Sequence, residues 1–171
     1  MQRPTSATVF GILNMVFAAF GLFGIIASIG LLMMAGKTDN PVIKVMQESP
    51  GYALWFKICI PLGLLSCVVL LAGGIGLMLV KPWGRLLSIG YAIYAIIFGF
   101  AGMIVNFLFL VRPMLEQAKD KSGPEAAGAI GGAIGGSIGG CFGMIYPILL
   151  LVFMFRPVIV AAFRPPAAPQ V

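Results

Sequence analysis

The sequence contains no histidine among its 171 residues. Without an imidazole, ligation of haem or chlorophyll by histidine, zinc sites that contain histidine and Ser-His-Asp hydrolysis are all excluded. We therefore expect no catalytic residues, no metal and no cofactor in this chain, and hence no enzyme.

Charge is nearly as scarce, because charged residues make up only 9% of the chain, against about 25% in a soluble domain. All five acidic residues lie outside the long apolar runs, so carboxylate proton relays and carboxylate-bound transport ions have no obvious residues. The eleven Lys and Arg residues are scattered in ones and twos at the ends of apolar segments, which is typical of membrane anchors. They form no basic stripe, so a nucleic-acid partner is not expected.

Cysteine is also too sparse for a disulfide framework. Cys59, Cys67 and Cys141 are the only three, all lie within apolar segments, and none belongs to a CxxC pair. We interpret them as small packing residues.

Long hydrophobic runs are what the chain does have, with 60% hydrophobic residues and a mean hydropathy of +1.07. Runs of 18 or more apolar residues recur, and about 20 helical residues cross a bilayer core of about 30 Å. We predict an all-α integral membrane protein, an antiparallel four-helix bundle with a glycine-rich fourth helix. The spans are expected at about residues 7–34, 52–80, 83–111 and 126–155, in one domain over 1–155 that is followed by a proline-rich C-terminal tail over 156–171.

The connections between these spans differ in kind. Only about four residues separate the second span from the third, which makes those two helices adjacent and antiparallel. Val42, Val45 and Met46 have helical spacing and predict a short interfacial helix in the first loop. The third helix is expected to continue into MLEQAKDK with a bend near Pro113, whereas the end of the tail, RPPAAPQV, is expected to be extended or disordered.

The orientation rests on the short KPWGR connection, residues 81–85. Counting Lys and Arg gives five on the side of the termini and six on the other, which decides nothing. A very short loop with two cations and a tryptophan favours the cytoplasm. We therefore expect a bacterial inner-membrane protein with both termini cytoplasmic.

Small residues recur at alternating spacings of three and four in three of the spans. Because the hydrophobic force between helices is weak in lipid, such rows supply close contact, and the alternation favours a left-handed bundle. The predicted rows are Gly11, Asn14, Ala18, Gly21, Ile25 and Ser28 in the first span, Cys59, Gly63, Ser66, Leu70 and Gly73 in the second, and Ser88, Ala92, Ala95, Gly99, Gly102 and Asn106 in the third.

The fourth span has glycine rows of period four instead, of the GxxxG kind. The rows are Gly128, Gly132, Gly136 and Gly140, and beside them Gly131, Gly135, Gly139 and Gly143. Such rows drift by about 40° per step and favour a close right-handed crossing with another helix. That helix can belong to the same molecule or to another one. A phosphate-binding loop is not expected, because GK[ST] and a preceding strand are absent.

Two asparagines are the strongest polar groups within the spans, Asn14 and Asn106. The first and third helices run in the same direction, which puts the two roughly 20 Å apart in depth, so they should not touch within one molecule. Each is expected to bond a neighbouring helix, and Tyr146 lies at a depth that suits Asn14.

The stretches RPTSATVFGILNMVFAAFGLFG and KPWGRLLSIGYAIYAIIFG resemble a loose class of small, uncharacterised bacterial membrane proteins with four spans. The resemblance implies a topology and no activity. Our functional hypothesis is a non-enzymatic scaffold or accessory subunit, whose partners are the lipid bilayer and either further copies of itself or a larger membrane complex. The alternative is a channel or carrier for a small solute.

Overall fold

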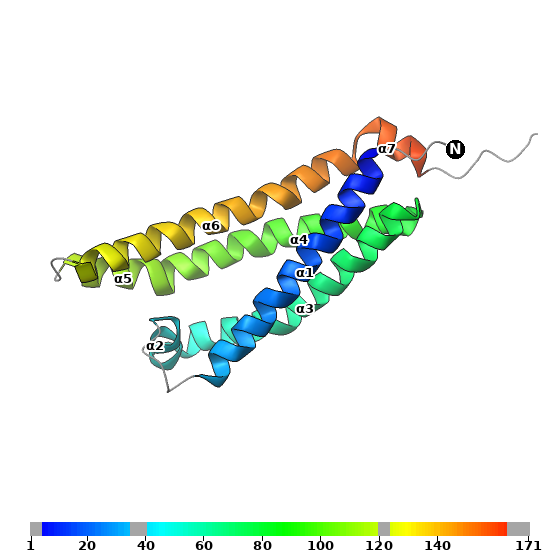
Figure 1. Cartoon of the computed structure of the whole chain (residues 1–171). Helices are drawn as coiled ribbons and strands as arrows, with labels where there is room; N and C mark the ends of the chain where they lie inside the picture. The colour runs from blue at the N-terminus through cyan, green and yellow to red at the C-terminus, as the bar shows by residue number, and fades with distance from the viewer. Residues whose placement is uncertain (1–4, 35–40, 120–123, 164–171) are drawn as a thin grey trace, which may run out of the picture.

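The computed structural model describes residues 5–34, 41–119 and 124–163, and all its regular elements in these ranges are helical. In α6, side-chain surroundings are described for residues 131, 135 and 140–154. The elements are α1 (Thr5–Met33), α2 (Pro41–Glu48), α3 (Pro50–Met78), α4 (Pro82–Asn106), the π-helical turn η1 (Phe107–Val111), α5 (Arg112–Lys119), α6 (Pro124–Met154) and α7 (Pro157–Ala162) (Figure 1).

Proline opens five of these helices, α2, α3, α4, α6 and α7. A proline in the first turn costs nothing there, because its missing N–H would have no helical partner anyway. At α3 the cap is completed by Ser49, whose side chain accepts a hydrogen bond from the Tyr52 backbone N–H at 3.4 Å. The short helix expected in the first loop is present as α2.

Among the residues that the structure describes, three helices are long and apolar enough to cross a membrane: α1, α3 and the continuous segment Pro82–Val111. Within the described part of α6, Gly140–Met154 forms a shorter apolar stretch. Large apolar side chains such as Phe20, Phe23 and Ile26 point outward from α1, with more than 60% of their surface exposed. Length, composition and this outward apolar surface together indicate a membrane protein.

The helices pack as a chain of neighbours, with α1 against α3, α3 against α4, and α4 against α6 (Figure 1). The α1 and α6 helices meet near α7 and separate toward the ends that carry α2 and α5 (Figure 1). The buried core lies where they meet. It contains Ala7, Phe10, Leu77, Ala92, Leu150, Met154, Ile159 and Phe163.

The contact between α1 and α3 follows the small-residue row predicted for the first span. A Cβ at Gly11 would lie 3.0 Å from the backbone oxygen of Gly74, and one at Gly21 would lie 2.6 Å from the Cys67 sulfur. The helices therefore touch nearly backbone to backbone at Gly11, which is how helices adhere in lipid.

The α3 helix has a second row of small residues, which the predicted row does not separate from the first. Gly63 lies against Ile25 of α1, but Gly73 and Gly76 face Ser88 and Gly84 of α4. The single row predicted for the second span thus mixes positions that serve two partners. Because α3 lies between α1 and α4, one row cannot supply both contacts.

The third helix continues to Lys119, as predicted, but the irregularity lies before Pro113. In the π-helical turn η1 the Arg112 N–H bonds to the Phe107 oxygen, five residues back. Pro113 has no N–H to offer the carbonyl four residues earlier, at Phe109, and a wider turn accommodates that loss.

The first residues of the proline-rich tail predicted over 156–171 are folded instead, up to Phe163, the last described residue. Pro157 starts the short helix α7, and its Ile159 and the following Phe163 are buried in the core. These side chains lie four residues apart and so share one helical face. RPPAAPQV itself lies outside the described residues.

Strain is concentrated in the tight connection between α3 and α4. Val80 has a φ of 52°, the left-handed region, where a β-branched residue is an outlier that costs about 1–3 kcal/mol.

We expect Val80→Gly to raise the free energy of unfolding by about 1 kcal/mol, because glycine adopts this φ without strain. The relief of strain should exceed the loss of the modest packing of the Val80 side chain. Unfolding with SDS in mixed micelles, followed by circular dichroism, measures the change. A lower stability for Val80→Gly would mean that the valine packing outweighs the strain.

Candidate functional site

A buried polar triad joins α1, α4 and α6. Asn14 and Ser88 are fully buried. The Asn14 Nδ2 donates to Ser88 Oγ at 3.1 Å, and the Tyr146 hydroxyl donates to Asn14 Oδ1. Ser88 in turn donates to the Gly84 oxygen at 2.8 Å. Each polar group is therefore satisfied inside an apolar core.

The hydrogen bond between Tyr146 and Asn14 is the one that their matching depth predicts. The Tyr146 ring also stacks on Phe17 of α1, with ring centroids 4.0 Å apart. Ser88 was missed as a member of the triad, although it heads the small-residue row of the third span at a depth similar to that of Asn14. A serine in a packing row signals a possible interhelical bond as well as small size.

Asn106 belongs to a separate contact, between α4 and α3. The Tyr52 hydroxyl donates to Asn106 Oδ1 at 3.3 Å. As expected from their depths, Asn14 and Asn106 each bond a neighbouring helix and do not bond each other.

The polar groups of the triad are an amide and two hydroxyls, all neutral in this setting. They can hold helices together, but they lack the paired acid and base that proton transfer needs. Within the part of the chain that the structure describes, no group of three or more His, Cys, Asp or Glu residues could hold a metal ion. The arrangement is therefore suited to packing.

Of the four row glycines of α6 whose surroundings the structure describes, one lies against a side chain of another helix. A Cβ at Gly140 would lie 3.4 Å from Met103 of α4. By contrast, an added Cβ at Gly131, Gly135 or Gly143 would meet nothing within 4 Å. The surroundings of the other glycines in the predicted rows lie outside what the structure describes; these are Gly128, Gly132, Gly136 and Gly139.

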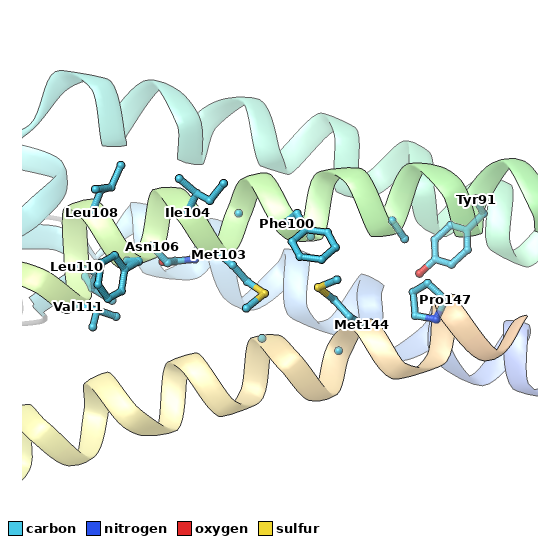
Figure 2. Close-up of a pocket in the computed structure, with 16 residues that line it drawn as sticks. Tyr91, Phe100, Met103, Ile104, Asn106, Leu108, Leu110, Val111, Met144 and Pro147 are labelled. Atoms are coloured by element: carbon cyan, nitrogen blue, oxygen red, sulfur yellow. The ribbon is translucent and has the colours of Figure 1, made fainter. Parts of the chain in front are cut away.

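An apolar groove of about 780 Å³ lies between the α4–η1 segment and α6. Its wall runs from Tyr91 to Val111 on one side and includes Gly140 to Pro147 on the other (Figure 2). Met103 and Met144 face each other across the middle of the groove (Figure 2). The sequence alone does not reveal this groove, because a glycine that leaves a hollow looks the same in sequence as one that lets another helix approach.

No protein-family model matches the sequence, and no curated protein or solved structure is significantly similar to it.

Proposed function

We propose that this protein is a non-enzymatic membrane scaffold or accessory subunit that associates with another transmembrane helix through the glycine face of α6. In this proposal α6 is a fourth membrane span, the protein resides in a bacterial inner membrane, and both termini are cytoplasmic. Its partners are the lipid bilayer and a second copy of itself or another subunit of a membrane complex.

The observation that carries the proposal is the open space at Gly131 and Gly135. Where glycines serve contacts within the chain, a neighbour fills the space. A Cβ at Gly76 would lie 2.5 Å from the Gly84 Cα, for example. At Gly131 and Gly135 nothing lies within 4 Å. A smooth helix face without side chains lets another helix approach closely, and two positions four residues apart form the GxxxG spacing.

The experiment replaces both glycines with leucine in the full chain. We expect Gly131→Leu with Gly135→Leu to reduce the size of the complex in native gels and by chemical cross-linking in membranes, because leucine holds a partner backbone away. The matched control is Gly24→Leu with Gly30→Leu on α1, where an added Cβ also meets nothing within 4 Å. This control should leave the complex unchanged.

Two results would contradict the proposal. One is a complex that keeps its size when both α6 glycines are leucine. The other is solute flux through liposomes that contain only the purified protein, which would favour the channel or carrier alternative.

A further inference from the structure

The groove between α4–η1 and α6 is open on its outer side. Phe100, Ile104, Phe107 and Leu108 line it and remain exposed. In a membrane protein, an exposed apolar surface of this kind faces lipid. The groove therefore opens sideways, toward the hydrocarbon chains of the bilayer.

The hollow is open at Gly143 on the α6 wall, where an added Cβ would meet nothing within 4 Å. On the α4 wall, Met144 already lies 3.4 Å from where a Cβ of Gly99 would be. The flexible side chains of Met103 and Met144 extend into the space between the two helices (Figure 2). Methionine fills irregular gaps and adapts to different occupants, which suits a wall that must fit a flexible chain.

The π-helical turn η1 forms part of the groove wall. Four of its five residues, Phe107, Leu108, Leu110 and Val111, line the hollow. The fifth, Phe109, points to α3 instead and packs against the Tyr52 ring at 6.0 Å between centroids. Inserted π-turns are frequent at functional sites, because they redirect side chains without ending the helix.

Polar groups occur where a lipid headgroup would lie. Arg112 follows the last groove residue directly, and its ion pair with Glu116 uses only Nε, at 3.1 Å. The guanidinium carries four further N–H groups, which bind phosphate well. Asn106, six residues or about 9 Å deeper, is an exposed residue on the groove wall whose Oδ1 accepts from the Tyr52 hydroxyl.

We propose that this groove binds a phospholipid, with its phosphate on Arg112 and one acyl chain between α4–η1 and α6 down to Met103 and Met144. The length of the groove matches the length of an acyl chain. The hydrocarbon of one leaflet is about 15 Å thick, and about ten helical residues, from Gly102 to Arg112, span that distance. The Asn106 amide then lies at the level of the ester carbonyls. The proposal does not depend on association through Gly131 and Gly135, which lie about 80–120° around α6 from Gly143.

The test is photolabelling of the full-length protein in vesicles that contain a trace of phosphatidylglycerol with a diazirine in its acyl chain. Adducts should concentrate on peptides that contain residues 99–111 and 140–147, relative to the equally lipid-facing surface at Phe20 and Phe23. Gly143→Leu should reduce these adducts several-fold by filling the groove, since an added Cβ there meets nothing within 4 Å. Gly24→Leu is the matched control and should change nothing.

Arg112→Gln tests the headgroup separately and leaves the apolar packing of the groove intact. Loss of one charge-assisted contact should lower groove labelling about tenfold, whereas Lys81→Gln, at the other end of the helix, should not. Labelling spread evenly over all lipid-facing surfaces would overturn the proposal. Groove labelling that stays unchanged in either Gly143→Leu or Arg112→Gln would do the same.

Discussion

Gly84→Ala is expected to lower the free energy of unfolding by about 3 kcal/mol, the upper part of the range for overpacked sites. A Cβ at Gly84 would lie 2.3 Å from the carbonyl carbon of Gly76 and 2.6 Å from the Leu77 nitrogen. These are backbone atoms that cannot rotate away, so α3 and α4 would have to separate beside the tight turn that joins them. Unfolding with SDS in mixed micelles measures the loss.

Gly90→Ala provides the matched control on the same helix. An added Cβ at Gly90 meets nothing within 4 Å, and alanine is the better helix former by about 1 kcal/mol. The control should therefore be as stable as the parent or more stable. Equal stability of Gly84→Ala and Gly90→Ala would show that the two helices do not cross at Gly76.

The second large effect is expected from Asn14→Leu, which removes both side-chain hydrogen bonds of Asn14. Ser88 keeps its bond to the Gly84 oxygen, but the Tyr146 hydroxyl loses its acceptor. An interhelical hydrogen bond in a membrane stabilises a protein by about 1 kcal/mol. Because two such bonds are lost, the free energy of unfolding should fall by about 2 kcal/mol.

A double-mutant cycle separates the Tyr146 bond from the rest of the effect. Tyr146→Phe alone should cost about 1 kcal/mol, and adding it to Asn14→Leu should cost little more, because the bond is already gone. Costs that simply add would mean that the two side chains do not interact. Asn106→Leu serves as a comparison at an exposed site and should cost less than Asn14→Leu.

Much of the helical framework could be predicted because its signals are local. Prolines mark the first turns of α4 and α6, and the apolar runs give the lengths of the helices. The pairing of Tyr146 with Asn14 could also be predicted from depth, since helix rise is constant and the connections fix the direction of each helix.

The features that sequence reasoning missed depend on which helix lies on which side. The split of Gly63 and Gly73 between two partners follows from the position of α3 between its neighbours. The groove beside Gly143 exists because α6 and the α4–η1 segment leave a space between them. Burial of Ile159 and Phe163 follows from where the chain turns after α6. None of these arrangements is encoded in the spacing within a single segment.

Because α1 separates from α6 but stays packed on α3 at Gly21 and Ile25, the outer parts of α1 and α3 together form a lever. From the ring stack at Phe17 to Met33, α1 runs 16 residues, or about 24 Å. A tilt of about 5° around the triad would move Met33 by about 2 Å while displacing Asn14 hardly at all. Spectroscopic labels near Met33 would therefore magnify angular changes that labels beside the triad would not register.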